Sequence, residues 1–588
     1  MRRPHIRRVA IAVAVTTAVT LPTGPAFAAA PDSSVRAAAS VSSPVDAARA
    51  AAFAHASATG VSQGDTLQAK DVMTDPDGKQ HVRFVRTHLG MPVLGGDLVV
   101  HLGKQSDYLG VTRAADHAVE PATTEAKLTP QQAEQKAAAV AKGDAGAAEL
   151  VVDARDGAAA LAYQVRVTDS DTAEAGGSRT VVVDARSGRI RSNTPDSDEF
   201  ISPTLGETLR ERGEQLNPET GTSARPTGLL GATAATTYPV KATGTGASLF
   251  AGKVTLTTTR TARTSYLLKD PTRWNTETRD ARGQELEAFA RGKKFTDADN
   301  KWGNGATSSR VTAAVDAQYG ITKTLDFYKA TFGRKGIKNN SAGARAMVHF
   351  GNKVGNAFWD STCGCMLYGD GDGDMLKKPL VVLDVTGHEL THGVVDATAA
   401  LEPTRVDQDG NQYGEPGSLN ESLADIFGSA VEFSANNPKN PPNYLVGEKL
   451  GLAQKFLRRL DHPSLDKLEG AVDYWSPEAY DTEVHAGSGV SSHAYYLLAE
   501  GSGRKTIGSV TYDSPTYDGS RVTGIGRAKA TAIFYRALTR YMVSTTDFHD
   551  ARKATLKAAA DMYGASSTEY KTVAKAWAAV NVTAANGR

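Results

Sequence analysis

The sequence predicts an α+β protein built from several parts, in which a strand-rich half and a helical half enclose a cleft and small α+β modules precede them. The chain has 588 residues, which is more than one hydrophobic core usually supports. The stretch KVTLTTTRTARTSYLLKD (253–270) alternates like antiparallel strands. Beyond residue 388 the spacing turns helical, with Ile533, Ala537, Leu538 and Tyr541 on one face.

Residues 1–28 have the pattern of a secretory signal. Four arginines precede an apolar run from Val9 to Leu21, and the small-x-small step Ala26-Phe27-Ala28 follows. The apolar run is too short to span a bilayer, so we expect a secreted protein. The pair Arg7-Arg8 leaves both the general and the twin-arginine export routes open.

The rest of the chain divides by composition and periodicity. The Ala/Ser-rich residues 29–60 are expected to be mobile, and 196–240, rich in Pro, Gly, Ser and charge, to be a linker that carries the activation cleavage. A hairpin at 81–103, a helix at 128–142 capped by Thr129, and strands at 161–167 and 179–190 indicate small modules before the linker. The predicted segments are modules at 61–125 and 126–195, a strand-rich half at 241–390 and a helical half at 391–588.

Charge and cysteine content exclude several classes. There are 66 Lys+Arg against 65 Asp+Glu, a net charge of +1, so no strong field attracts nucleic acid or an anionic membrane. We expect neither partner, and a monomer. Cys363 and Cys365, in STCGC, are the two cysteines, which excludes a disulfide scaffold. They either bond to each other or remain thiols.

The stretch GHELTHGVVD (387–396) contains the strongest chemical motif. On a helix, His388 and His392 share a face and can bind one zinc ion, with Glu389 beside them to act on water. The alternative is a solvated or core histidine pair. The apolar run PLVVLDV (379–385) before the motif favours a buried element.

A second segment, GSLNESLADIFGSAVEF (417–433), offers the missing ligand. Glu421 and Asp425 are four residues apart in a run with a clear buried stripe. Glu421 then completes a two-His, one-Glu zinc site, and Asp425 accepts a hydrogen bond from a ligand histidine. This segment alone equally permits surface carboxylates on an amphipathic helix.

HELTH followed by GSLNESLADIFG resembles the thermolysin family of secreted neutral zinc metallopeptidases. The resemblance covers about residues 240–588, and the region from about 60 to 195 is similar to thermolysin/fungalysin-type propeptide modules. It implies a zymogen whose pro-region assists folding and blocks the cleft, and whose substrates are polypeptides. Further matches occur in the family's order: NAFWD (356–360), MLYGDGDG (366–373), LRRLDHP (457–463), EVHAGSG (483–489) and GIGRAKATAIFYRALTRYM (524–542).

The resemblance also implies roles for single residues. One catalytic zinc is bound by His388, His392 and Glu421 with a water in the fourth position, which Glu389 activates as general base. His485 stabilises the oxyanion, and Asp481 orients it, although one residue closer in sequence than the family pattern. Tyr413, which precedes GEPGSLNE, is the candidate for the oxyanion tyrosine. Its placement is open because the segment 401–418 is longer than in the family's best-known member.

Substrate-binding and calcium positions follow from the same resemblance. Asn356 and Arg458 match residues that hold the substrate backbone, and STCGC beside them either reshapes the cleft edge or is a plain hairpin tip. Three apolar residues match the pocket for a bulky apolar residue just after the scissile bond: Val385, Val446 and Leu457. Structural calcium is implied at one site, with a second, weaker site at Asp297 and Asp299. The first site comprises Asp384, Glu432, Asn443, the carbonyl of Leu445 and Glu448.

Two other functions fit a protein of this kind. A secreted binding protein that had lost the chemistry would be free to lose Glu389, Glu421 or His485, yet all three are present. A zinc hydrolase that acts on esters or on other amides can be distinguished from a peptidase only by an activity assay.

Overall fold

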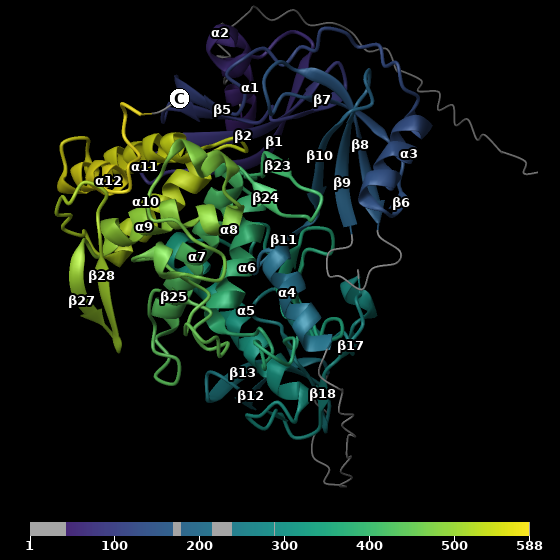
Figure 1. Cartoon of the computed structure of the whole chain (residues 1–588), viewed down its shortest axis with the longest axis vertical. Coiled ribbons are helices and arrows are strands. Elements are labelled where there is room, and N and C mark those ends of the chain that lie inside the picture. The colour runs from purple at the N-terminus through teal and green to yellow at the C-terminus, as the bar shows by residue number, and fades with distance from the viewer. Residues whose placement is uncertain (1–42, 169–177, 215–237, 287, 587–588) are drawn as a thin grey trace, which may run out of the picture. The chain divides into compact units, whose positions relative to one another are not determined.

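The computed structural model describes residues 43–168, 178–214, 238–286 and 288–586 (Figure 1). The predicted signal peptide and residues 215–237 of the predicted linker lie outside these ranges. Within them, no helix combines the length and the apolar character that crossing a membrane requires. The predicted fold class is confirmed: strand-rich elements, teal in Figure 1, precede helices that run from green to yellow.

The two N-terminal modules share one sheet. Its strand order is β10-β9-β8-β7-β3-β2-β4-β5, with β1 paired to β2 and β6 paired to β8. The modules join where β3 runs parallel to β7, with Val93 opposite Val152. The predicted helix is confirmed as α3 (Pro130–Ala141), where Thr129 forms a capping box with Gln132. The strands are β1 (Asp65–Thr74), β2 (Gln80–His88), β3 (Met91–Leu94), β4 (Leu98–Leu102), β5 (Tyr108–Arg113), β6 (Asp144–Ala145), β7 (Glu149–Asp153), β8 (Ala160–Thr168), β9 (Ser178–Asp184) and β10 (Ile190–Pro195).

The Ala/Ser-rich segment differs from the prediction. Residues 44–59 form α1 (Pro44–Ala54) and α2 (Ala56–Thr59) rather than a mobile stretch. Ser43 caps α1 through the amide of Asp46, and Pro44 begins the helix, a favourable start. Ala48 and Ala52, four residues apart, are buried in the core of the first module. The small side chains of this segment therefore allow close helix packing, although its Ala/Ser-rich composition resembles that of a linker.

The predicted linker also contains ordered elements. Residues Ser197–Glu199 form β11, and Pro203–Glu214 form α4. Strand β11 pairs antiparallel with β21 (Ala357–Asp360) and is the end strand of a mixed sheet. This seven-stranded sheet has the order β11-β21-β22-β20-β16-β15, with β17 paired to β16. Its remaining strands are β15 (Lys269–Asp270), β16 (Thr276–Asp280), β17 (Lys293–Lys294), β20 (Arg345–Val348) and β22 (Cys365–Tyr368).

A five-stranded sheet completes the strand-rich half, in the order β18-β14-β13-β12-β19. Its strands are β12 (Val240–Ala247), β13 (Lys253–Ala262), β14 (Ser265–Leu267), β18 (Thr296–Asp297) and β19 (Lys301–Trp302), and the 3-10 helix η1 covers Phe289–Arg291. STCGC is the turn between β21 and β22, and Cys363 and Cys365 form a disulfide.

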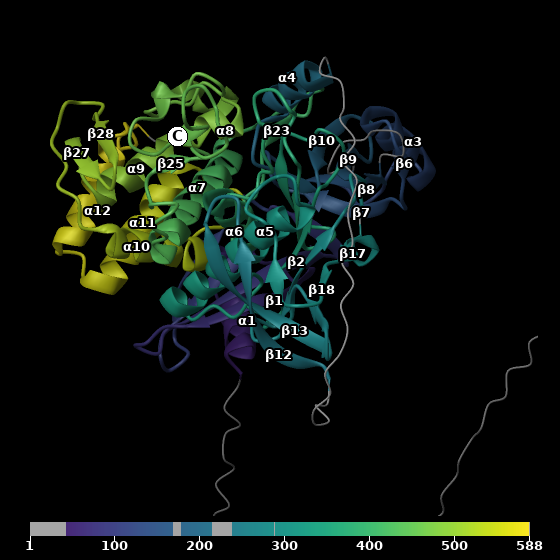
Figure 2. The same ribbon diagram turned by 90° about the horizontal axis from the view of Figure 1, so that it is seen from below.

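Three central helices link the two halves: α5 (Arg310–Phe332), α6 (Leu383–Asp396) and α7 (Glu415–Ala435). They lie side by side in Figures 1 and 2. Glycines allow α6 and α7 to approach closely. A Cβ on Gly387 would meet the Cα of Gly428 at 2.9 Å, and a Cβ on Gly428 would meet the carbonyl oxygen of Asp384 at 2.7 Å. This close contact sets the distance between the side chains of the two helices.

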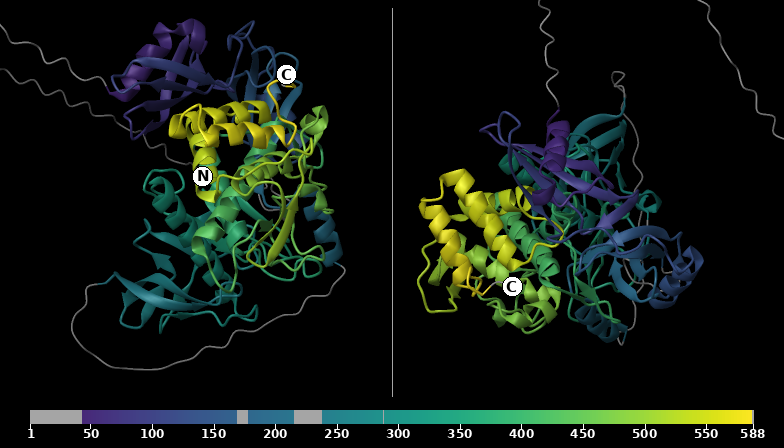
Figure 3. Two further views of the ribbon diagram at one scale, coloured as in Figure 1. Left: turned by 90° about the vertical axis from the view of Figure 1, so that its left-hand side faces the viewer. Right: turned by 90° about the horizontal axis from the view of Figure 1, so that it is seen from above.

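The C-terminal half is helical, as predicted. Figure 3 shows its last helices, in yellow, packed against one another. Ile533, Ala537 and Leu538 of the predicted stripe lie on α10 and are fully buried. The helices are α8 (Val484–Gly487), α9 (Gly489–Ala499), α10 (Arg527–Arg540), α11 (Phe548–Tyr563) and α12 (Thr568–Ala578). The short elements are β23 (Arg405–Val406), β24 (Gln412–Tyr413), β25 (Leu445–Val446), β26 (Arg458–Arg459), η2 (Pro463–Leu465), η3 (Pro477–Asp481), β27 (Gly503–Ile507) and β28 (Val510–Ser514).

Candidate active site

Helices α6 and α7 bring two imidazoles and one carboxylate together. The Nε2 atoms of His388 and His392 are 3.0 Å apart. Glu421 Oε2 lies 3.4 Å from His388 Nε2, and Glu421 Oε1 lies 3.6 Å from His392 Nε2. All three residues are buried, and their ligand atoms lie within 4.8 Å of one another. Two imidazole nitrogens and a carboxylate are the donor set of a catalytic zinc site, so these residues fit zinc.

Side chains on α7 orient both histidines. Asp425 Oδ1 lies 2.7 Å from His388 Nδ1, and Asn420 Oδ1 lies 3.0 Å from His392 Nδ1. Since both oxygens accept, each Nδ1 donates, and each Nε2, once deprotonated, can offer its lone pair to a metal ion. The structure thus places Asp425 where the sequence predicts it and adds Asn420, which the motif spacing does not reveal.

The two histidines differ in basicity. Burial alone would lower the pKa of His388, but the carboxylates of Asp425 and Glu421 raise it to about 9. Burial lowers the pKa of His392 to about 4. A proton or a metal ion is therefore favoured beside His388, where the carboxylates gather.

Glu389 is a buried carboxylate beside the cluster. It is fully buried, and neither of its oxygens has a hydrogen-bond partner among the described residues. Burial raises its pKa well above the ordinary glutamate value, and the nearby Glu421 and Asp198 carboxylates add to the shift. A buried carboxyl group with a raised pKa is suited to accepting and returning a proton near neutral pH.

His485, at the start of α8, faces the same cluster from another element. Its Nε2 lies 3.6 Å from Glu421 Oε2. Burial alone would lower its pKa, but Glu483 and Glu421 raise it well above the ordinary histidine value. His485 is therefore a charged donor at neutral pH, as an oxyanion partner requires.

The residue that orients His485 differs from the prediction. Glu483 Oε1 lies 2.9 Å from His485 Nδ1, and Glu483 Oε2 accepts from the backbone N–H of His485 at 2.8 Å. Asp481 instead has a side chain that is 72% exposed and pairs with Arg405 at 3.2 Å. Glu483 is the N-cap residue of α8. It therefore orients the His485 imidazole, a role that the motif spacing assigned to Asp481.

Tyr413 lies on β24 within the long 401–418 segment. Its hydroxyl donates to Asp407 Oδ2 at 2.8 Å, and Arg405 lies over its ring, 4.0 Å from the centroid. An isolated bridge joins its main chain to Glu483. The structure thus places Tyr413 next to the residue that holds His485, with its hydroxyl bonded to the aspartate of its own loop.

The two predicted substrate-binding residues lie on different elements. Asn356 precedes this strand, and Arg458 begins β26; both are buried. Arg458 donates to both oxygens of Asp425, at 2.8 and 3.0 Å, and to Glu469 Oε2 at 2.9 Å. Glu469 is a partner that no sequence motif marks. The predicted pocket residues Val385, Val446 and Leu457 are buried in the main hydrophobic core.

A separate cluster of carboxylates lies at the predicted calcium position. Asp384, Glu432 and Glu448 each offer an oxygen within 4.8 Å of the others. Burial and the Asp384 charge raise the pKa of Glu448 to about 8, and burial and the Glu448 charge raise that of Glu432. Three mutually repelling carboxylates, of which Asp384 and Glu432 are buried and Glu448 is half-buried, fit a hard cation. Asn443 donates to Glu448 at 3.0 Å, and its own side-chain oxygen accepts from the amide of Leu445 at 2.6 Å.

The second predicted calcium position is arranged differently. Asp297 Oδ2 accepts from the amides of Asp299, Asn300 and Lys301. Lys301 also pairs with Asp299 at 3.3 Å. The two aspartates thus form a hydrogen-bonded turn, and a weaker calcium site at Asp297 and Asp299 stays a prediction.

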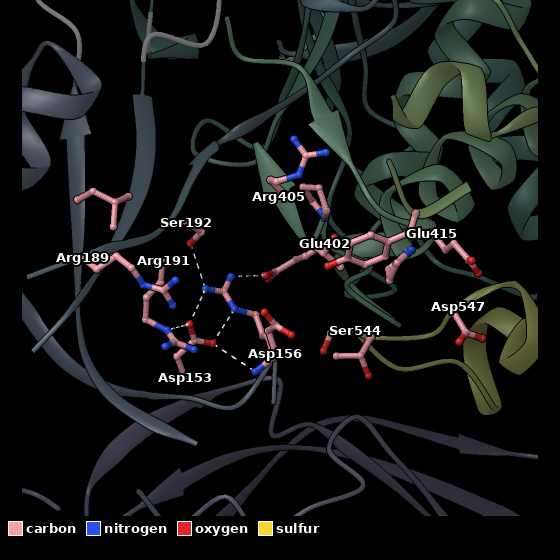
Figure 4. A pocket seen from close by; sticks show the side chains of 17 residues that line it. Asp153, Asp156, Arg189, Arg191, Ser192, Glu402, Arg405, Glu415, Ser544 and Asp547 are labelled. Atoms are coloured by element: carbon pink, nitrogen blue, oxygen red, sulfur yellow. Dashed lines mark hydrogen bonds and ion pairs between the residues drawn. The ribbon is translucent and has the colours of Figure 1, made fainter. Parts of the chain in front are cut away.

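A cavity of about 350 Å³ lies away from the histidines, between the second N-terminal module and the C-terminal half (Figure 4). Arg155 reaches across it to Glu402 Oε2 at 3.2 Å. Asp153 holds Arg155 at 2.9 Å and Arg191 at 2.7 Å. The zinc-fitting residues do not line this cavity. The ion pairs in it instead join the second module to the helical half.

Comparison with known families gives four matches along the chain. The model described as "Thermolysin metallopeptidase, catalytic domain" matches residues 243–396, and "Thermolysin metallopeptidase, alpha-helical domain" matches 411–582. The "Fungalysin/Thermolysin Propeptide Motif" matches 65–115, and "Peptidase propeptide and YPEB domain" matches 127–193.

Individual relatives agree with these models. The transglutaminase-activating metalloprotease of Streptomyces mobaraensis is 39% identical over 89% of this chain, which spans 62% of that protein's length. The bacillolysin of Bacillus cereus is 32% identical over 87% of this chain and 84% of its own. Among solved structures, the precursor of protealysin from Serratia proteamaculans aligns with 52% of this chain and 87% of its own, at 26% identity and a TM-score of 0.39. Given the sequence matches, the chain belongs to the thermolysin family of metallopeptidases.

Proposed function

We propose that this chain is the zymogen of an exported, zinc-dependent neutral endopeptidase. The observation that carries the proposal is the buried set His388, His392 and Glu421 beside an unpartnered Glu389, with His485 facing it. When bound there, zinc supplies Lewis acidity that polarises a carbonyl and lowers the pKa of water. The signal-like residues 1–28 support export.

The chain's own residues divide the remaining work. Glu389 takes the proton of the attacking water and returns it to the leaving amine, a role that its raised pKa supports. Protonated His485, held by Glu483, donates to the developing oxyanion. Arg458 and Asn356 hold the substrate backbone, and Asp425 fixes both His388 and Arg458.

Specificity follows from the pocket beside Arg458. Val385, Val446 and Leu457 are buried, apolar and part of one core cluster. A bulky apolar side chain fits such a lining, whereas a charged one would lose its hydration. We therefore propose cleavage on the amino side of bulky apolar residues.

The N-terminal modules act as folding aid and inhibitor in this proposal. They contact the helical half through buried charges: Arg83 donates to the carbonyl oxygen of Met542 at 2.8 Å, and Arg536 pairs with Asp75. One calcium ion held by Asp384, Glu432 and Glu448 stabilises the enzyme.

A casein assay tests the proposal. Processed protein should degrade casein, lose this activity to a zinc chelator and regain it with zinc. Ester hydrolysis without casein degradation by processed, zinc-loaded protein would instead make it a different zinc hydrolase. No hydrolysis of either substrate by that protein would favour a binding protein.

A further inference from the structure

Residues 197–202 of the chain lie across the candidate active site. Strand β11 adds to the end of the sheet, with Ser197 opposite Asp360 and Glu199 opposite Phe358. Adding a strand to a sheet edge is a general way to bind an extended polypeptide, because the main chain supplies the hydrogen bonds. The segment therefore occupies the place of a substrate, and its register identifies the bond at the reacting centre.

The residues after β11 are held by the predicted substrate-binding groups. The amide of Phe200 donates to the carbonyl oxygen of Ala357 at 3.0 Å, and Arg458 Nη1 donates to the carbonyl oxygen of Phe200 at 2.9 Å. Asn356 accepts from the amide of Ile201 at 3.0 Å and donates to its carbonyl at 3.1 Å. Four main-chain groups of two consecutive residues are thus bound, which fixes the register at one position.

The carbonyl before Phe200 meets the proposed oxyanion donor. His485 Nε2 lies 2.7 Å from the carbonyl oxygen of Glu199 and donates to it. On the other side, the Phe200 ring packs edge-on against the His388 ring, with centroids 5.2 Å apart. The peptide group between Glu199 and Phe200 therefore lies between the oxyanion donor and the zinc-fitting histidines.

The Phe200 side chain fills the apolar pocket. It is fully buried in the same core cluster as Val385 and Leu457. A Cβ added at Gly447 would lie 3.3 Å from Leu457 and 3.6 Å from the Phe200 ring, so Gly447 lies beside both the ring and the predicted pocket residue Leu457. Shifting the register by one residue would put Glu199 or Ile201 into this pocket and break the bonds to Asn356 and Arg458.

We propose that Glu199–Phe200 is the first bond that the enzyme cuts in its own chain; this inference rests on the peptidase function proposed above. Water adds across the bond: its oxygen joins the carbonyl carbon of Glu199, the C–N bond breaks, and the nitrogen of Phe200 takes the proton. The products are a carboxylate at Glu199 and an amino group at Phe200.

This first cut leaves the cleft filled. Ser202 donates through its amide to Glu469 Oε1 at 2.9 Å, and Thr204 donates through its hydroxyl to Asn411 Oδ1 at 2.9 Å. Leu205 and Leu209 of α4 are buried in the main core. The segment from Phe200 onward also remains covalently joined to the catalytic region. Activity toward other proteins therefore waits for a later cut downstream of α4.

Mass spectrometry of new N-termini tests the proposal. The zinc-loaded full chain should yield a first fragment that begins at Phe200, and Glu389→Gln should stay intact. Phe200→Asp places a charge in the apolar pocket and should slow this cut by at least about 100-fold, whereas Phe200→Leu should retain it. Phe53→Asp is the matched control, because Phe53 is 38% exposed on α1, and it should be cut like the wild type.

A peptide of residues 194–205 tests the same bond without requiring the variant zymogen to fold. Processed enzyme should cut it between glutamate and phenylalanine. If the protein degrades casein but its first new N-terminus is not Phe200, the inference is wrong and the proposed function stands. The same holds if it degrades casein but does not cut the peptide at this bond. No casein degradation and no processing overturns the proposed function itself. In a time course, casein activity that rises together with the Phe200 terminus overturns the need for a later cut.

Discussion

Asp425→Asn is the most informative single substitution, because one carboxylate accepts three hydrogen bonds. His388 Nδ1 lies 2.7 Å from Oδ1, and Arg458 donates to Oδ2 at 2.8 Å and to Oδ1 at 3.0 Å. The amide retains one oxygen for His388. Its NH₂ group, however, faces the Nε–H of Arg458, so donor meets donor.

The expected effect has two parts. Loss of the orienting charge should weaken zinc binding about 10- to 100-fold, the range seen when a ligand's hydrogen-bond partner is replaced. Losing one charge-assisted bond should also cost about 1.5–3 kcal/mol of unfolding free energy. The cost stays below that of a fully broken buried pair, because Glu469 still holds Arg458 at 2.9 Å.

The assay is competition for zinc against a chromogenic chelator, with urea unfolding in parallel, on the Glu389→Gln chain so that it stays intact. Asn420→Ala is the matched comparison. It removes a neutral bond of 3.0 Å to His392, worth about 0.5–1.5 kcal/mol, so its zinc affinity should fall by about tenfold at most. Zinc affinity of a folded Asp425→Asn chain within about threefold of the parent would refute the reasoning, as would a larger loss for Asn420→Ala.

Three further outcomes are expected. Glu389→Gln should keep zinc but lower casein hydrolysis by about 100-fold or more; activity within about tenfold of wild type would remove Glu389 as general base. At about pH 9, where Glu448 is ionised despite its raised pKa, Glu448→Gln should raise the melting temperature in a calcium chelator, because it removes a repelling charge, and lower it in millimolar calcium, because it removes a ligand; the same sign in both would exclude a calcium site here. Burial alone would raise the pKa of Asp153, but Arg155 and Arg191 lower it to about 2. At pH values above the unfolded-state pKa of about 4, this depressed pKa contributes about 2–3 kcal/mol to the free energy of unfolding. The contribution is lost as the pH falls toward 2. The deficit of Asp153→Asn in unfolding free energy should therefore narrow over that range, and a constant deficit would contradict the ion-pair account.

The zinc-fitting set could be predicted because its members follow the helix period. His388 and His392 are one turn apart on α6, and Glu421 and Asp425 are one turn apart on α7. Such spacing is visible in the sequence whatever the tertiary structure. The choice of Asp481 instead of Glu483 shows the limit: the cap of a four-residue helix depends on where that helix begins, which counting from a motif does not determine.

Strand β11 could not be predicted for a different reason. Its three residues carry no visible alternation, and its partner β21 lies about 160 residues later in the chain. Composition therefore indicated a linker. The same limit applies to α1, where the partners of Ala48 and Ala52 on the first module make the helix stable.

Removal of the pro-region changes what β21 presents to solvent. With β11 gone, its main-chain amides and carbonyls on that side lose their partners and become a template for any extended strand. A substrate segment would then first have to adopt an extended conformation to pair with β21, and only afterwards would the fit of its side chain matter. Loose loops and unfolded proteins would be attacked, while compact folds with every strand paired would survive, including the enzyme's own folded copies.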